Sequence, residues 1–379
     1  MNTAKKPVWP KVLGIICLVL VLLLGGLYWF ANSKLDRLHH STEATPIPET
    51  EVTDESLDDE MLVDAPGTEN MHEVDKILTP DGEIVTQDGI LNILLLGTDE
   101  RSYQFNEASR ADSITLLSLN FNDGSVNLTS LERYMGVEML GGKYPGKIDY
   151  LNHCFRWGGA DLMLKEVQEY FKIDVDKYIR VNFTTFTQII DSLGGIDVEL
   201  TNAEANILNT DGSTSHLGAK DENGHYIQFS THRQSGFRKG MNHLYGPAAL
   251  TFARLRTIDS NWERIERQRN VLQACITRLK EIDLKTLNNM INDVLPLVDT
   301  NFSNGELISL ALKCPKFIGA ECTQLTIPID RYQMGRITTY THNRAWAPDY
   351  EFNSAVMHEA IYGSSENAQL MIDEFLAAH

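Results

Sequence analysis

Basic residues are scarce in this sequence, and a long apolar run occurs only once. Lysine and arginine number 33 against 52 acidic residues, which gives a formal net charge of −19. General nucleic-acid binding requires a basic surface, so this composition argues against a nucleic-acid partner. After Ala31 no stretch is long enough to cross a bilayer. Residues 32–379 are therefore expected to lie on one side of any membrane that the first run crosses.

Cysteine is also scarce, and its spacing excludes a structural zinc site. Only five cysteines occur, without a CxxC pair, and Cys17 lies inside the apolar run. Cys314 and Cys322 are close enough in the sequence for a disulfide in an oxidising compartment, with free buried thiols as the alternative. The GxSxG, HExxH and P-loop motifs are absent, and the eleven histidines show no metal-ligand spacing. These absences argue against the common hydrolase sites.

The apolar run 12–31 predicts a transmembrane helix. Twenty residues without a charge span about 30 Å as a helix, which matches the hydrocarbon thickness of a bilayer. Lys5, Lys6 and Lys11 precede the run and place the tail 1–11 in the cytoplasm. The alternative is a cleaved signal peptide, which requires a shorter apolar core and a small-residue cleavage site. No good site follows the run, so we expect a single-pass anchor with the rest of the chain outside the cell membrane.

Residues 32–88 are expected to form an acidic, flexible stalk. From residue 43 to 88 acidic residues are frequent, Lys76 is the only lysine or arginine, and apolar periodicity is absent. Prolines at 46, 48, 66 and 80 interrupt the segment. Such a segment buries too little apolar surface to offset the entropy lost on ordering.

Alternating strand and helix patterns predict an α/β fold after the stalk, with a central mixed β-sheet flanked by helices. Expected strands lie at 91–96, 112–119, 125–131, 178–181 and 196–200. Expected helices lie at 160–171, 184–193, 247–254, 262–281, 284–297, 304–313, 352–361 and 365–377. We divide this part into a catalytic domain at 89–283 and a helical C-terminal extension at 284–379.

The segment 253–269 concentrates positive charge in an otherwise acidic protein. It holds Arg254, Arg256, Arg264, Arg267 and Arg269. Helical spacing places Arg264, Arg267 and Gln268 on one face. Converging planar guanidinium groups suit a multi-oxygen anion such as pyrophosphate, whereas the alternative is a solvated helix surface paired with nearby carboxylates.

Two aspartates follow or open predicted strands. Asp99 comes directly after the first strand, and Asp112 opens the second one, next to Arg110. Two carboxylates at adjacent strand ends can hold Mg²⁺ together with water and substrate phosphates. Aspartates near turns more often only form the turn, and that alternative stays open. Arg133, at the end of the return strand, is a further cation for the same site.

The order of these motifs resembles the LytR-CpsA-Psr (LCP) family. The series ILLLGTDER, RADSITLLSLN, SLER, LNHCFRWGG, VNFTTFTQIIDSLGGIDVEL, MNHLYGPAALTFARLR and DSNWERIERQR covers roughly residues 90–283. The resemblance implies an LCP-like α/β sandwich and a Mg²⁺- or Mn²⁺-dependent phosphotransferase of the Gram-positive envelope. Such enzymes move a glycopolymer, for example teichoic acid or capsule, from a polyprenyl-pyrophosphate donor to peptidoglycan.

The resemblance also implies roles for individual residues. It gives Asp99 and Asp112 the metal-binding positions. It gives the pyrophosphate-binding positions to Arg133, Arg254, Arg256, Arg264 and Gln268, with Arg133, Arg254 and Arg256 as the catalytic group, and adds Arg110 and Arg267 as family-typical positions. The apolar segment 181–190 is a candidate wall for the lipid, with ordinary core packing as the alternative.

The sequence departs from the family pattern at three positions. Tyr134 stands where the family usually has Asp, Tyr150 where it usually has Lys, and Asn261 where it often has Asp. Two alternative functions therefore stay open. One is a non-catalytic protein that binds lipid-linked polymer, and the other is an envelope-related regulator of the kind once named transcriptional attenuators.

Overall fold

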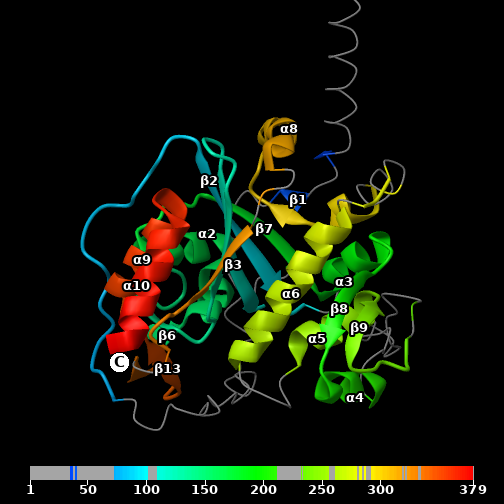
Figure 1. The fold of residues 1–379 in the computed structure, drawn as a ribbon. Coiled ribbons are helices and arrows are strands. Elements are labelled where there is room, and N and C mark those ends of the chain that lie inside the picture. The colour runs from blue at the N-terminus through cyan, green and yellow to red at the C-terminus, as the bar shows by residue number, and fades with distance from the viewer. Residues whose placement is uncertain are drawn as a thin grey trace, which may run out of the picture.

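A mixed seven-stranded sheet forms the centre of the protein (Figure 1). The computed structural model describes residues 35–36, 39–40, 72–100, 109–210, 232, 234–255, 261–279, 281–283, 286, 292–317, 320, 322–331 and 334–378. Within these residues no helix is long and apolar enough to cross a membrane. The expected transmembrane helix 12–31 lies outside the described residues.

The sheet confirms the predicted mixed topology. Its order is β1 (His39–His40), β10 (Asp299–Thr300), β7 (Lys177–Asn182), β2 (Ile90–Thr98), β3 (Ala111–Asn120), β4 (Val126–Leu131) and β11 (Cys322–Ile327). The pairs β1–β10, β7–β2 and β4–β11 are parallel, and the other three are antiparallel. The β3–β4 hairpin turns at Gly124, whose φ of 85° is a conformation that glycine adopts without strain.

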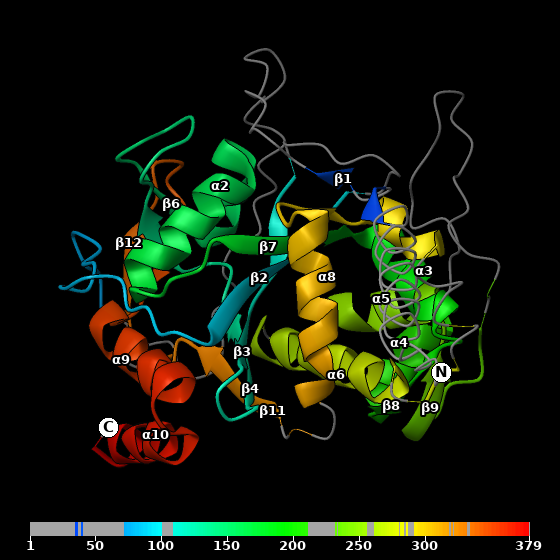
Figure 2. The same cartoon turned by 90° about the horizontal axis from the view of Figure 1, so that it is seen from above.

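Helices cover both faces of the sheet (Figures 1 and 2). One face carries α2 (Leu151–Phe171) and α9 (Tyr350–Tyr362), and α10 (Ser365–Ala378) packs on α9. The other face carries α3 (Phe183–Ser192), α5 (Gly246–Arg254) and α6 (Asn261–Leu279), with α4 (Asn202–Thr210) beside α5 and α8 (Asn304–Lys313) at the far end. The short elements are β5 (Gly136–Glu138), β6 (Ile148–Tyr150), β8 (Ile196–Leu200), β9 (Gly240–Leu244), β12 (Gly335–Thr338), β13 (Arg344–Ala347), η2 (Leu295–Leu297) and η3 (Cys314–Phe317).

Alternating apolar residues explain why the sheet is covered on both faces. Along β2, Leu94 and Leu96 point into the larger core with α2 and α9, whereas Ile93 belongs to a smaller core beneath α8. The period of two along a strand sends neighbouring side chains to opposite faces. Both faces must therefore be packed against helices.

The C-terminal part is more than the helical extension that the sequence suggested. It supplies β10 and β11 to the central sheet and adds the β12–β13 hairpin. These strands are short, and their partners lie far away in the sequence. Local periodicity therefore carries too little signal to reveal them.

The predicted stalk also ends earlier than residue 88. The N–H of Val74 donates to the carbonyl of Arg336 at 2.8 Å, and the N–H of Val85 donates to the carbonyl of Lys172 at 2.8 Å. Ile77 is buried in the larger core. Residues 72–88 are therefore part of the folded domain, despite their acidic composition.

The helix predicted at 160–171 begins earlier, as part of α2. Gly158 and Gly159 form a kink inside this helix, with φ values of −160° and 65°, instead of preceding its start. Cys154 and Cys275 are free thiols, and Cys322 Sγ donates to the carbonyl of Thr323 at 3.8 Å. The side chain of Cys314 lies outside the described residues, so a disulfide between Cys314 and Cys322 stays a prediction.

Candidate active site

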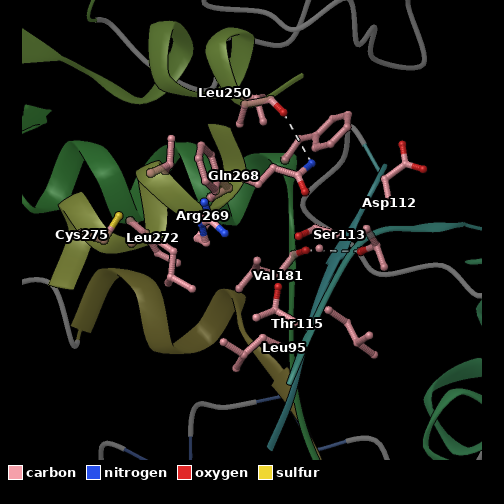
Figure 3. A pocket seen from close by; sticks show the side chains of 18 of the residues that line it. Leu95, Asp112, Ser113, Thr115, Val181, Leu250, Gln268, Arg269, Leu272 and Cys275 are labelled. Atoms are coloured by element: carbon pink, nitrogen blue, oxygen red, sulfur yellow. Dashed lines mark hydrogen bonds between the residues drawn. The ribbon is translucent and has the colours of Figure 1, made fainter. Parts of the chain in front are cut away.

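A cavity of about 360 Å³ lies between the sheet and the helices α3, α5 and α6. Figure 3 shows Asp112 and Gln268 toward one end of it and Leu95, Leu272 and Cys275 toward the other. Most of the lining is apolar and includes Leu95, Ile179, Val181, Phe183, Phe186, Ile189, Ile190, Leu272 and Ile276. Polar groups gather at one end and include Asp112, Arg254, Arg264 and Gln268. The cavity thus combines an apolar slot with a charged mouth.

The segment 181–190 forms one wall of this slot. β7 contributes Val181, and α3 contributes Phe186 and Ile190. Asn182 begins α3 by accepting a hydrogen bond from the backbone N–H of Thr185 at 2.9 Å. This cap fixes the turn from strand to helix, and hence the direction in which the apolar side chains enter the cavity.

Asp99 and Arg110 meet where β2 ends and β3 begins. The backbone N–H of Arg110 donates to Asp99 Oδ1 at 3.0 Å, and Arg110 Nη2 lies 3.3 Å from Asp99 Oδ2. The register of the β2–β3 pair shifts between Gly97 and Thr98, and this irregularity changes the direction of β2 just before Asp99. Burial and the nearby charge of Asp112 raise the pKa of Asp99 above its ordinary value. The two predicted metal-binding carboxylates therefore lie close enough for each to feel the charge of the other.

Asp112 is held ionised by arginines. Arg133 Nη1 donates to Asp112 Oδ1, and Asn152 Nδ2 approaches the same oxygen at 3.5 Å. Burial opposes ionisation, but the positive charges of Arg133, Arg264 and Arg110 outweigh it and lower the pKa of Asp112 to about 2. Asp112 is therefore a carboxylate at any physiological pH.

Arg264 is the most unusual side chain of the cavity. It is 2 % exposed and lines the cavity, and its buried Nε has no hydrogen-bond partner. The described part of the chain contains no hydrogen-bond or ion-pair partner for this guanidinium group. Burial and the charge of Arg133 lower the pKa of Arg264 below its ordinary value, although Asp112 and Glu132 oppose them. A buried cation without a direct partner is costly, and an anion placed beside it would offset that cost.

Two further predicted residues lie beside Arg264. Arg254 lies over the ring of Phe183, with its Cζ 4.3 Å from the ring centre. Gln268, one helical turn after Arg264, reaches the carbonyl of Ala253 at 3.5 Å. The structure thus brings Asp112, Arg254, Arg264 and Gln268 together at the cavity.

The prediction that Arg267 shares this face is wrong. Its Nη1 lies 3.3 Å from Glu204 Oε1, and its Nη2 donates to the carbonyl of Leu255 at 2.8 Å. It is buried and does not line the cavity. Arg267 therefore joins α6 to α4 instead of contacting a ligand in the cavity. Arg256 lies outside the described residues.

Two polar side chains near the site were given no individual role by the family resemblance. Arg269 lines the cavity and donates from Nη1 to Thr326 Oγ1 at 3.3 Å. Glu132 is fully buried beside Arg133, and its Oε2 has no hydrogen-bond partner. Burial raises the pKa of Glu132, although Arg264 and Arg133 oppose this. The charge-rich segment 253–269 pointed to Arg269, whereas no local pattern pointed to Glu132.

Two departures from the family pattern lie in contact with each other. The rings of Tyr134 and Tyr150 are 4.9 Å apart between centres. Arg133 Nη2 donates to the hydroxyl oxygen of Tyr134, and the Arg133 Cζ lies 4.2 Å from its ring centre. Burial raises the pKa of Tyr134 to about 12, so its hydroxyl stays neutral. An aromatic pair thus supports Arg133 where the family pattern has two charged residues.

The donor set fits a hard divalent cation that shares its ligands with a substrate. The described residues contain no cluster of three or more histidine, cysteine or acidic side chains placed to hold a metal ion. Asp99 and Asp112 offer two carboxylates, and their mutual repulsion would be relieved by a cation. Mg²⁺ commonly completes such a pair with water and phosphate oxygens.

The chain is similar to known proteins in both sequence and fold. A sequence model of the LytR_cpsA_psr family matches residues 60–350. The chain is 30 % identical over 223 residues to the polyisoprenyl-teichoic acid–peptidoglycan teichoic acid transferase TagU of Bacillus cereus, covering 58 % of this chain and 63 % of that protein. It is 29 % identical over 306 residues to the TagU of Oceanobacillus iheyensis, covering 77 % of this chain and 76 % of that protein. The chain thus spans less than two thirds of the length of the first of these relatives.

Solved structures share the fold. Protein gbs0355 of Streptococcus agalactiae matches with a TM-score of 0.55 at 19 % identity, covering 75 % of this chain and 88 % of that one. TagT bound to LI-WTA matches with a TM-score of 0.52 at 21 % identity, covering 78 % and 96 %. TagV of Bacillus subtilis matches with a TM-score of 0.52 at 22 % identity, covering 74 % and 100 %.

Proposed function

We propose, since the chain belongs to the LytR_cpsA_psr family, that it is a glycopolymer phosphotransferase. In this proposal it moves a glycopolymer, such as teichoic acid, from a polyprenyl-pyrophosphate carrier to peptidoglycan. The similarity to proteins named as teichoic acid transferases supports the substrate class. The site adds an independent argument, because it combines an apolar slot with a mouth that selects an anion.

The observation that carries the proposal is Arg264. Its buried guanidinium group lines the cavity and has no direct partner among the described residues. A pyrophosphate at the mouth would supply the missing charge, and a prenyl chain would occupy the apolar slot beyond it. Arg254 and Gln268 line the same end and offer further donors to the phosphate oxygens. A lipid-linked pyrophosphate matches both halves of the cavity.

In the proposed reaction, a hydroxyl oxygen of the acceptor sugar attacks the glycan-side phosphorus. A new P–O bond forms, and the bond from that phosphorus to the bridging oxygen breaks. Polyprenyl monophosphate leaves with the bridging oxygen, the acceptor hydroxyl proton passes to water, and the glycan becomes joined by a phosphodiester. Such transfer is catalysed mainly by positioning and by stabilising the developing charge on the phosphate oxygens. The arginines of the mouth provide that positive charge.

We propose Mg²⁺, or Mn²⁺, as the cofactor, held by Asp99 and Asp112. When bound, it would neutralise charge on the phosphate oxygens. Arg110 and Arg133 hold these two carboxylates in place in the described structure. Of the two carboxylates, Asp112 lines the cavity, and Asp99 follows Thr98, which also lines it.

The apolar run 12–31 is proposed to anchor the protein in the cell membrane, with the catalytic domain outside the cell. A membrane anchor would keep the cavity near the bilayer in which the lipid-linked donor is carried. The acceptor in this proposal is peptidoglycan, on the same side of the membrane.

Replacement of Arg264 by Met tests the function. The full chain is reconstituted in vesicles with a polyprenyl-pyrophosphate-linked glycan, peptidoglycan fragments and Mg²⁺, and released polyprenyl phosphate is measured. We expect Arg264→Met to lower turnover by about 100-fold or more, because a buried charge on the phosphate is lost. Thermal stability should change little, because the desolvation cost of the buried cation and its attraction to Asp112 and Glu132 are lost together.

Arg267→Met is the matched control three residues along the same helix. It leaves buried Glu204 without its guanidinium partner, so we expect stability to fall by about 3–5 kcal/mol. Turnover per folded molecule should be retained. Unchanged turnover in Arg264→Met would overturn the proposed function. Tight binding of the donor without any turnover in the unmodified chain would instead identify a non-catalytic binding protein.

A further inference from the structure

The outward face of α8 carries one highly exposed leucine, Leu312. Leu307 and Leu310 pack inward on the small core of the sheet, and no residue of α8 is fully buried. On the outer side, Leu312 is 78 % exposed, the largest fraction among the exposed large apolar residues that the structure describes. Ile308 lies one turn earlier on the same side and is half-buried. A single exposed leucine is ordinary, so its surroundings decide what this face does.

The chain enters the folded domain next to α8. Asn304 Nδ2, at the start of α8, donates to Asp36 Oδ1 at 2.6 Å. His39 of β1, three residues after Asp36, pairs with Asp299 of β10 at the edge of the sheet. Figures 1 and 2 both show β1 beside α8. The N-terminal side of the domain is therefore the edge formed by β1, β10 and α8.

Chain length then fixes how far this edge can lie from the proposed anchor. The apolar run ends at Ala31, five residues before Asp36. Five extended residues span at most about 18 Å. The start of α8 is therefore held within that distance of the outer end of the span. This step rests on the anchor of the proposed function.

The charges on this edge favour an anionic lipid surface. Glu306 is paired with Lys177 at 2.7 Å, so its negative charge is compensated. Lys313 is exposed at the C-terminal end of α8, and Lys316 is exposed in η3, where its Nζ donates to the carbonyls of Phe121 and Asn122. Both are cations in a protein whose net charge is −19. Anionic headgroups attract such cations near the membrane surface. The outer face thus combines apolar side chains with neighbouring cations.

The small core beneath α8 continues into the cavity. Leu95 and Ile179 line the cavity and also pack in the cluster that contains Leu307 and Leu310. α8 therefore lies at the apolar end of the cavity, whereas Asp112 and Arg264 lie at the other end. A membrane against α8 would face the end that suits a prenyl chain.

We infer that the outward face of α8, formed by Ile308, Leu312 and Lys313, docks on the outer leaflet of an anionic lipid bilayer. Docking orients the apolar end of the cavity toward the membrane and the arginine mouth away from it. The lipid tail then enters beside α8, and the pyrophosphate reaches the mouth that faces the cell wall.

An environment-sensitive fluorescent amino acid at position 312 tests the docking surface. The full chain is reconstituted in vesicles that contain phosphatidylglycerol and a spin-labelled lipid quencher. The matched control carries the same fluorophore at position 370, where Leu370 is 57 % exposed on α10. α10 lies far from α8 in both views (Figures 1 and 2). We expect blue-shifted, lipid-quenched emission at 312 and water-like, unquenched emission at 370.

Equal, unquenched emission at both positions would overturn the inference. A blue shift at 312 without lipid quenching would also overturn it, because a second copy of the chain would then cover the face. Lys313→Glu should weaken quenching at 312 several-fold in phosphatidylglycerol vesicles at low salt. The measurement needs no substrate, so a docked but inactive protein would refute only the proposed function. An active but undocked protein would refute only the docking.

Discussion

Carboxyl groups behave in opposite ways at different places in this protein, and the surrounding charges decide which way. Asp112 is partly buried among arginines, and its pKa is lowered to about 2. Glu166 is also buried, but the backbone N–H of Leu140, at 2.7 Å, is the main group that favours its charged form. Burial therefore prevails and raises the pKa of Glu166 to about 7. The first carboxylate belongs to the site, whereas the second makes stability depend on pH.

Replacement of Glu166 by Gln should stabilise the protein at neutral and alkaline pH but not at acidic pH. The folded state keeps the Glu166 proton up to about pH 7, whereas the unfolded chain loses it near pH 4.5. The stability that this proton contributes is therefore complete below pH 4.5 and is lost as the pH rises to 7. The neutral amide avoids this loss, so Glu166→Gln should be more stable by up to about 3 kcal/mol at pH 8.

Urea unfolding at pH 5 and pH 8 measures this difference. Asp161→Asn is the control, because Asp161 is an exposed carboxylate on the same helix. It should change stability by a similar small amount at both pH values. A benefit of Glu166→Gln that is equal at pH 5 and pH 8 would contradict the assignment.

The sequence predicted the types of residue at the site better than their contacts. Helical spacing correctly placed Arg264 and Gln268 together, because a period of four residues fixes one face. The same argument failed for Arg267, whose guanidinium group turns toward Glu204, 63 residues earlier in the chain. A side chain as long as arginine can reach around a helix, so its partner depends on tertiary packing.

At the scale of elements, α6 joins the two halves of the cavity. Arg264 and Gln268 face the mouth, and Leu272, Cys275 and Ile276 follow on the same side along the slot. Spacings of three and four residues keep these side chains on one stripe. One helix therefore sets the distance between the charged group and the lipid chain of any ligand.

Replacement of Cys275 by Phe should block the slot without unfolding the protein. Cys275 lines the apolar end of the cavity, so a larger apolar side chain there has space to enter. We expect affinity for polyprenyl phosphate to fall by about tenfold or more, while unfolding stability changes by about 1 kcal/mol at most. Binding is measured by isothermal titration calorimetry in detergent micelles.

Thr277→Phe is the control, because Thr277 is exposed on the same helix and its side chain is absent from the cavity lining. It should leave the affinity unchanged. Equal affinities of Cys275→Phe and the unmodified chain would show that the lipid lies elsewhere.

Elements with strong local patterns were predictable, and elements defined by distant partners were not. The apolar runs of β2, β3 and β4 and the turn at Gly124 identified three neighbouring strands of the sheet. β11 pairs in parallel with β4, although nearly 200 residues separate them, and its six residues read equally well as a loop. The acidic composition of residues 72–88 predicts a spacer. Composition does not reveal the isolated β-bridges that attach this segment to the domain.

At the scale of the whole molecule, the contacts of Asp36 and β1 limit how far the domain can move from the proposed anchor. A flexible stalk from 32 to 88 would let the domain move far from the membrane. Asp36 and β1 already contact the domain at the edge of the sheet, and they precede most of that segment in the sequence. The domain is therefore contacted by the chain both before residue 41, at Asp36 and β1, and after residue 71, at residues 72–88.

Insertions at two places should therefore differ in their effect on docking. A flexible insertion of about twelve glycine and serine residues between Asn32 and Ser33 lengthens the link between anchor and α8. The effective concentration of α8 at the membrane falls, and lipid quenching at position 312 should weaken several-fold. The same insertion between Thr53 and Asp54 lies after β1, so quenching should stay unchanged. Equal effects of the two insertions, or no effect of either, would contradict the attachment at the β1 edge.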